Sequence, residues 1–279
     1  MHLQNAKKLR LMKGKKLLFV GEEILPFLPE SPKSAYGKAV PKYASENGMA
    51  VRALLPKWGI INERRNQLHE VIRLSGLNII INDIDHPLLI KVASLPSTRL
   101  QVYFTDNADL FKKRQMIIDA EGKEYEDNYI RSIFYARSSL ETCNLLHWDP
   151  AIIQCQGWFS VLVPFYLKKY FKENPLLKQA KIIITLYNEK LKSPLPKEII
   201  DMICCQNITK NDIDEVGIEL KSFSDLMKFG ITFADGIICG DKNIPQEWIS
   251  VAKENNIPVL DYCEEKFVEK TFEFYKSIS

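Results

Sequence analysis

The sequence of 279 residues contains no apolar run near the roughly 18 residues that a membrane-spanning helix needs, and no apolar segment follows its basic start. Its formal net charge is only +3, and its lysines are interspersed with glutamates. A chain without a large field of one sign has little attraction for a polyanion. These absences argue against a membrane protein and against nucleic-acid binding, and we expect a cytoplasmic protein.

Cysteine and histidine are present but are not spaced as metal ligands. The chain has 6 cysteines without a CxxC pair and 4 histidines without ligand spacing. It also lacks a Walker loop, a GxGxxG segment and a GxSxG segment. We therefore expect buried free thiols and ordinary histidines, with neither a metal nor a cofactor.

Length and composition are those of a globular protein. Hydrophobic residues make up 46% and charged residues 26% of the sequence, and 279 residues are enough for one large domain. Residues 1–14 carry several lysines and arginines and no acidic residue, which we interpret as a basic flexible leader. We expect one domain over residues 15–262 and a closing helix over residues 263–279 that packs on it.

Short apolar runs recur along the chain and predict buried strands. The first run, Leu17 to Val20, is followed by a loop and by an amphipathic helix that ends near Gly48. Similar runs predict strands at 51–55, 151–155, 181–186, 236–239 and 258–260. Three β-rich runs at 77–81, 88–95 and 100–105 predict a hairpin or meander at one sheet edge.

Continuous apolar strands that alternate with helices predict an α/β fold: a Rossmann-like, mostly parallel sheet with helices on both faces. Ligands of such sheets bind where strands end and the chain crosses to a helix. The segment from Gly21 to Ser34 is therefore the first place to look for a site.

Three blocks of the sequence carry a family resemblance. Glu23, Pro26 and Phe27 follow the first strand, VRALLPKWG occupies residues 51–59, and a third block runs from Asp106 to Arg131. Together they resemble bacterial glycogen synthases and plant starch synthases, the retaining glucosyltransferases that use ADP-glucose. The resemblance implies the N-terminal domain of a GT-B glycosyltransferase, with ADP-glucose or an α-glucan as ligand.

The sequence departs from the family pattern at polar positions. The family follows Glu, Pro, Phe with Lys, any residue, Gly, Gly, Leu, whereas the Lys position here is Pro29 and the Gly pair is Ser31 and Pro32. Two family histidines correspond to Gln154 and Gln156, and a family aspartate corresponds to Gly157. A proline removes a backbone N–H donor, and glutamine offers only neutral hydrogen bonds. The departures predict a degenerate active site.

Several residues remain candidates for substrate binding by resemblance, although no catalytic residue is identified because the family histidine is Gln156. For Asp127 and Asn128 we favour a structural role instead, as caps of a helix that starts at Tyr129. The candidates are Glu23, Pro29, Ser31, Asp127, Asn128, Gln154, Trp158 and Asn188.

Two classes of function stay open. The first is a glycogen or starch synthase-like enzyme that is weak or inactive alone, because the resemblance ends near Asp235 and we expect the second nucleotide-binding domain to be absent. A separate partner chain could then complete it. The second is a non-catalytic module that binds a glucan, a nucleotide or a protein. A homodimer across the face that a second domain would cover is a further alternative.

Overall fold

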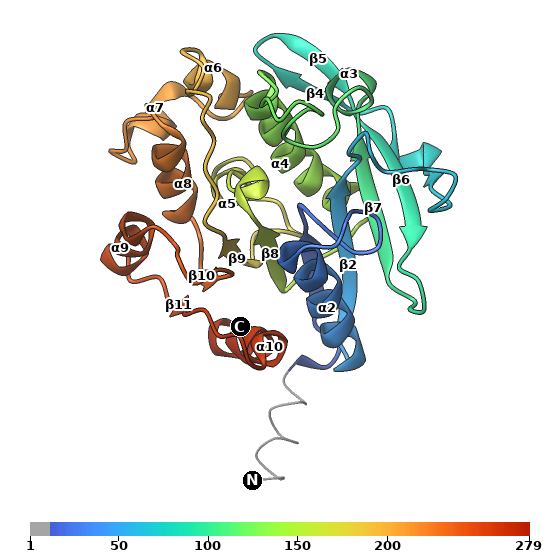
Figure 1. The fold of residues 1–279 in the computed structure, drawn as a ribbon. Coiled ribbons are helices and arrows are strands. Elements are labelled where there is room, and N and C mark those ends of the chain that lie inside the picture. The colour runs from blue at the N-terminus through green and yellow to red at the C-terminus, as the bar shows by residue number, and fades with distance from the viewer. Residues whose placement is uncertain (1–11) are drawn as a thin grey trace.

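The computed structural model describes residues 12–279. Its main element is a nine-stranded sheet with the order β11-β10-β9-β8-β1-β2-β7-β6-β3 (Figure 1). Seven neighbouring strands are parallel, and β6 and β3 continue the sheet in antiparallel pairing. Residues 1–11, which hold most of the expected basic leader, lie outside the described part, and Met12 belongs to the buried core. The predicted mostly parallel α/β sheet is confirmed.

The parallel strands are β1 (Lys16–Val20), β2 (Ala50–Pro56), β7 (Gln101–Asp106), β8 (Ile152–Gln156), β9 (Lys181–Leu186), β10 (Gly236–Cys239) and β11 (Val259–Leu260). They are short and apolar because helices cover both faces. The exception is β8, IIQCQ, in which Gln154 and Gln156 are both fully buried. A buried amide side chain must find hydrogen-bond partners, so these two positions mark polar contacts inside the core.

The chain direction places helices on both faces. α2 (Pro32–Glu46) connects β1 to β2, while the chain from β7 runs in the opposite direction across the sheet through α4 (Asn128–Leu145) to β8. Right-handed crossovers then place these two helices on opposite faces. α5 (Val163–Lys169), α8 (Phe223–Ile231) and α9 (Gln246–Glu254) follow on the α4 side. The shorter helices are α3 (Ala108–Phe111), α6 (Ile199–Ile203) and α7 (Lys210–Asp214), with 3-10 turns at Ile72–Leu74 and Trp158–Ser160.

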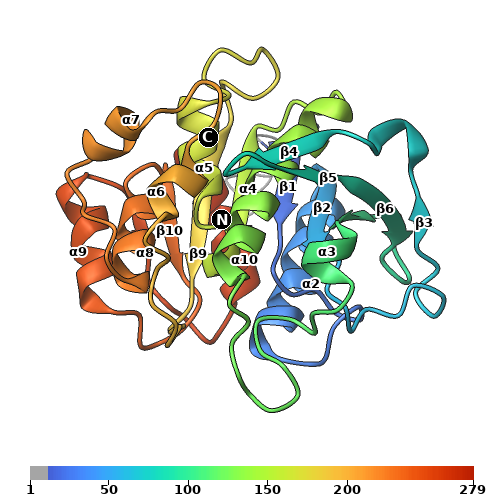
Figure 2. The same ribbon diagram turned by 90° about the horizontal axis from the view of Figure 1, so that it is seen from above.

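The edge region differs in part from the prediction. β6 (Leu89–Ser94) pairs with β7 and with β3 (His69–Glu70), as a meander would. However, β4 (Asn78–Ile81) pairs with β5 (Ile84–Pro87) in a separate two-stranded hairpin, which lies beside α4 in Figure 2. Asn82 and Asp83 form its turn with φ of 49° and 60°. Two successive positive φ values suit a tight hairpin, so β4 finds its partner locally and not in the main sheet.

The C-terminal helix α10 (Phe267–Ile278) lies against α2 (Figure 1) and begins four residues later than the expected start at Cys263. Phe267 stacks on Tyr36 with ring centroids 4.8 Å apart, and Thr271 shares a hydrogen bond of 2.9 Å with the Tyr36 hydroxyl. Tyr275 is fully buried. This helix therefore closes the face of the sheet that α2 covers.

The thiols are free, but only some are buried as expected. Cys143, Cys155 and Cys239 are buried, whereas Cys204, Cys205 and Cys263 are half-buried because they lie in loops. Among the helices of residues 12–279, none combines the length and the apolar character needed to cross a bilayer.

Candidate functional site

The sheet has its topological switch point between β1 and β8. From β1 the chain moves to β2 on one side, and the strand on the other side is β8, followed by β9. At this point the connections leave in opposite directions, and in open α/β sheets the ligand crevice lies there, at the carboxyl ends of the strands. The residues that follow these strand ends are Glu22 and Glu23 after β1, Gln156 and Gly157 at β8, and Glu189 after β9.

Gln156 closes the crevice from the β8 side. Its Oε1 accepts hydrogen bonds from the backbone N–H groups of Glu22 and Glu23 at 3.0 and 3.1 Å, and its Nε2 donates to the carbonyl oxygen of Lys33 at 2.8 Å. The side chain is fully buried. The amide therefore connects β8 to the end of β1 and to the start of α2. Because both its oxygen and its nitrogen bond to the backbone, it has little capacity left to bond a ligand.

Lys33 occupies the centre of the site. Its Nζ lies 3.1 Å from Oε2 of Glu22 and 3.9 Å from Oε1 of Glu23, and it forms a direct ion pair with Glu189. The same ammonium group lies 5.0 Å from the centroid of the Tyr187 ring. The lysine side chain is only 11% exposed. One cation thus holds carboxylates from two strand ends.

Sequence reasoning missed Lys33 and Glu189. A signal for Lys33 was present, because it stands at the leucine position of the pattern Lys, any residue, Gly, Gly, Leu. A lysine at an apolar position needs a buried partner or an exposed path. Glu189 could not be found this way, because its side chain meets Lys33 across 156 residues of sequence.

Gly157 makes this arrangement possible. It has φ of 74° and ψ of 177°, a conformation that is essentially restricted to glycine. A Cβ atom at this position would lie 2.0 Å from Oε2 of Glu22 and 3.1 Å from Nζ of Lys33. The family pattern has an aspartate here, whose side chain would enter the space that the ion pair fills.

Burial controls the charges of the site. Burial, with the nearby Glu189 carboxylate, raises the pKa of Glu22 to about 8, and Lys33 only partly opposes this shift. Burial alone would lower the pKa of Lys33, but Glu189, Glu22 and Glu23 together raise it. Near neutral pH the site therefore contains a charged lysine, a largely protonated Glu22 and two other acidic side chains.

The raised pKa of Glu22 predicts a pH-dependent stability. Because its pKa is about 8 in the folded protein against 4.5 for the unperturbed group, the folded state holds an extra proton between these values. The contribution of Glu22 to the free energy of unfolding should be complete below pH 4.5 and should be lost as the pH rises towards 8. Urea unfolding of the wild type and of Glu22→Gln at pH 5, 6, 7 and 8 measures this. The difference between the two proteins should change steadily with pH, and parallel curves would contradict the assignment.

Ser31 and Pro32 start a helix in place of the family's glycine pair. The Ser31 hydroxyl accepts a hydrogen bond from the Ser34 N–H, and the Ser34 hydroxyl accepts one from the Ser31 N–H, both at 2.9 Å. Pro32 occupies the first turn of α2, where a missing N–H costs least. Ser31 also donates to Oε2 of Glu23 at 2.6 Å. The expected connecting loop therefore ends at Ser31, and Lys33 is helical.

The other candidates do not all gather in the crevice. Gln154 faces the α10 side, where it donates to the Tyr36 hydroxyl at 2.9 Å and accepts a hydrogen bond from Tyr275. Trp158 is buried, and its backbone N–H donates to Glu189 at 3.1 Å. Pro29 and Asn188 are exposed at the rim. Of the candidates, Glu23 belongs to the ion-pair cluster of Lys33, Glu22, Glu23 and Glu189, and Ser31 and Trp158 contact this cluster through the bonds described above.

The capping role expected for Asp127 and Asn128 is wrong. α4 begins at Asn128, and Asp127 holds the capping position, but its φ of −90° and ψ of 10° are not extended and its side chain makes no capping bond. Its carboxylate instead pairs with Arg114, with Nη2 to Oδ2 at 2.8 Å. Asn128 donates to the carbonyl of Ile117 and accepts from the buried Arg131. Both residues therefore brace the segment that precedes α4.

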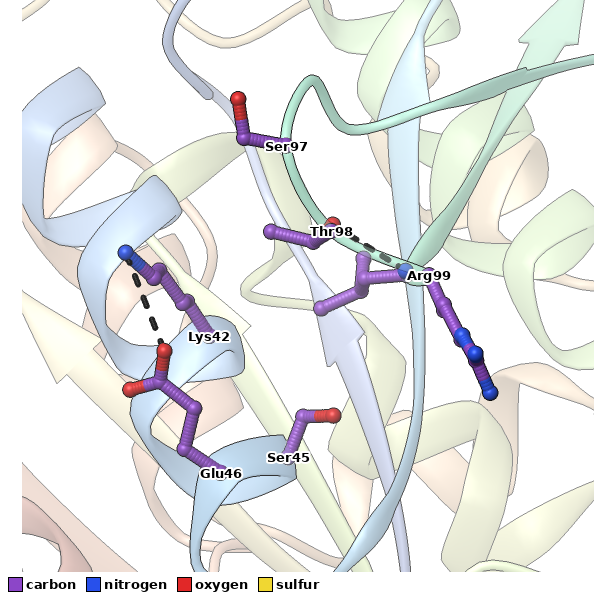
Figure 3. A pocket seen from close by; sticks show the side chains of 7 residues that line it. Lys42, Ser45, Glu46, Ser97, Thr98 and Arg99 are labelled. Atoms are coloured by element: carbon purple, nitrogen blue, oxygen red, sulfur yellow. Dashed lines mark hydrogen bonds and ion pairs between the residues drawn. The ribbon is translucent and has the colours of Figure 1, made fainter.

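The site offers no obvious place for a metal ion. Across residues 12–279 there is no group of three or more His, Cys, Asp or Glu side chains placed to hold one. A separate pocket of about 530 Å³ lies between the end of α2 and the turn before β7 (Figure 3). Lys42 pairs there with Glu46 at 3.8 Å. This pocket is at the amino-terminal edge of the parallel strands, opposite to the crevice, so it does not belong to the site.

A mostly parallel sheet with its polar cluster at the switch point defines a Rossmann-like domain of the GT-B glycosyltransferase type. Residues 16–255 match the family described as starch synthase catalytic domain. The glycogen synthase of Chlorobium luteolum is 31% identical over 70% of this chain and 40% of its own length, and that of Chlorobaculum tepidum is 33% identical over 66% and 38%. The chain therefore belongs to the starch synthase catalytic domain family.

A solved structure agrees with this fold. The catalytic domain of starch synthase IV from Arabidopsis thaliana, bound to ADP and acarbose, matches with a TM-score of 0.70 and 15% identity, over 89% of this chain and 52% of that chain. The chain spans about 40% of the length of the curated relatives that it matches.

Proposed function

We propose that this chain acts in α-glucan metabolism as a glycogen/starch synthase-type domain whose own crevice does not support efficient glucosyl transfer. The observation that carries the proposal is the ion-pair cluster of Lys33 with Glu22, Glu23 and Glu189 at the switch point. Family membership supports the metabolic context.

The departures from the family pattern support one another. Lys33 replaces a leucine, Gly157 replaces an aspartate, and Gln156 replaces a histidine. The glycine leaves the space in which Glu22 and Lys33 meet, and the glutamine accepts the N–H groups of Glu22 and Glu23. If the catalytic residues had been lost independently, the residues in their place would not be expected to form a paired cluster. We therefore infer that the residues of the cluster were selected together.

The electrostatics of the cluster disfavour a sugar diphosphate. Glu23 and Glu189 are partly exposed carboxylates on either side of Lys33, and this cation is already paired with them. A diphosphate group needs free donors, and like charges in a partly buried site repel it. The start of α2 does not compensate, because Pro32 has no N–H group and the N–H of Ser34 is bonded to Ser31.

A chimera tests this proposal. In this chimera, residues 16–255 of the present chain replace the matching part of the Chlorobaculum tepidum glycogen synthase. All other residues come from the Chlorobaculum tepidum enzyme. With ADP-glucose and a glucan primer we expect no ADP release above background, because the crevice lacks free donors for the developing charge. A control chimera with the matching part of the Chlorobium luteolum glycogen synthase shows whether the exchange itself is tolerated.

A further inference from the structure

A pocket of about 800 Å³ lies away from the crevice, between the β4–β5 hairpin, α4 and the end of α6. Figure 2 shows the hairpin beside α4. The exposed apolar side chains of the pocket are Leu77 and Ile80, while the neighbouring Ile79 is buried. Arg137 and Glu141 from α4 line the same pocket, as do Asp83 in the hairpin turn and Asp201, which pairs with Lys210 at 2.6 Å. An apolar wall with a few convergent polar groups is the usual composition of a small-molecule site.

Arg137 is an unpaired cation in this pocket. It stands four residues before Glu141 on α4, a spacing that ordinarily permits an ion pair. Its Nη1 instead donates to the carbonyl oxygen of Ile80 on the hairpin. Among residues 12–279, no carboxylate lies within ion-pair distance of its guanidinium group. The hairpin contact thus fixes the guanidinium in the pocket and leaves further N–H donors available.

Glu141 is the matching unpaired anion. Its side chain is half-buried, and within the described part of the chain no cation lies at ion-pair distance from its carboxylate. Burial raises the pKa of Glu141, and the charge of Arg137 acts in the opposite direction, so the two groups share one environment. The pocket therefore presents separate positive and negative groups, each of which would gain from a partner of opposite charge.

We propose that this pocket binds a free α-amino acid with an apolar side chain. The ligand carboxylate binds the Arg137 guanidinium, the ligand ammonium binds Glu141, and the side chain packs on the exposed Leu77 and Ile80. The inference is independent of the function proposed for the crevice.

Other ligand classes fit the charges less well. A simple organic acid would pair with Arg137 but would bring a second negative charge towards Glu141. An amine would pair with Glu141 but would bring a second positive charge towards Arg137. A neutral oligosaccharide would leave both charges without a counter-charge. Only a zwitterion neutralises both groups at once and still offers an apolar portion to the hairpin wall.

Calorimetric titration of the full chain tests the proposal with matched ligands. L-Leucine is compared with 4-methylpentanoate, which lacks the ammonium group, and with 3-methylbutylamine, which lacks the carboxylate. We expect L-leucine to bind, and each half-ligand to bind at least tenfold more weakly. Arg137→Met and Glu141→Gln should each weaken leucine binding at least tenfold, while Lys42→Met in the distant pocket should leave it unchanged.

Thermal unfolding of each variant shows whether it is folded. If Arg137→Met does not fold, Arg137→Lys is used in its place. The lysine keeps the charge but loses the fork of the guanidinium, so it should still weaken binding. L-Phenylalanine is titrated as a second amino acid with an apolar side chain. If neither L-leucine nor L-phenylalanine binds, the proposal is overturned. Equal affinity for 4-methylpentanoate and leucine, or binding of maltotetraose that depends on Arg137, overturns it as well.

Discussion

Replacing Lys33 by methionine is expected to lower the free energy of unfolding by about 3–5 kcal/mol, because it leaves largely buried carboxylates without their cation. The side chains of Glu189 and Glu23, which both lie at ion-pair distance from the lysine, are 21% and 19% exposed. Methionine has a similar length, so the packing changes little and the loss reports mainly on charge. Urea unfolding at pH 7 measures it.

Two controls separate charge from packing in this experiment. Lys42→Met removes an exposed lysine from the same helix and should change the free energy of unfolding by less than about 0.5 kcal/mol. Adding Glu189→Gln to Lys33→Met should recover part of the loss, because the side chain that has lost its cation is then a neutral amide. If Lys33→Met is as mild as Lys42→Met, the ion-pair cluster does not stabilise the domain.

Replacing Gly157 by alanine is the second change with a large expected effect. Backbone strain at φ of 74° and ψ of 177° alone should cost about 1–3 kcal/mol. The new Cβ would also lie 2.0 Å from Oε2 of Glu22, so the carboxyl group must move away from Lys33. The total loss in unfolding free energy should therefore exceed the strain alone.

Gly122→Ala provides the matched comparison. Gly122 also has a positive φ, of 80°, but a Cβ there would meet nothing within 4 Å. The difference between the two alanine variants in urea unfolding reports on the displacement of Glu22 together with any difference in backbone strain between the two sites. Equal losses would show that the space at Gly157 is not needed for the cluster.

The sequence allowed the sheet to be predicted because its strands are local signals. Runs such as Leu17–Val20 and Lys181–Leu186 are apolar, short and bounded by turns, and both are strands. The β4 strand was misplaced because pairing is not a local property. Its turn at Asn82 and Asp83 has the residues of a hairpin, and this chemistry outweighed the apolar pattern that suggested the main sheet.

The site was predicted only in its location. The end of β1 was the expected place, and Glu23 and Ser31 do lie there beside Lys33. The partners could not be predicted, because Glu189 reaches Lys33 only after β8 and β9 are aligned with β1. Asp127 shows the opposite error: its residue type suits a helix cap, but Arg114 competes successfully for its carboxylate.

The rate of ADP release by the chimera that contains residues 16–255 tests the closed crevice most directly. Loss of one stabilising donor commonly reduces a rate about 100-fold to 1,000-fold, and here both the glycine pair and the histidine position at Gln156 are changed. The closed crevice predicts a rate about 10⁴-fold or more below that of the parent glycogen synthase, while the control chimera stays active. A rate within tenfold of the parent would contradict it.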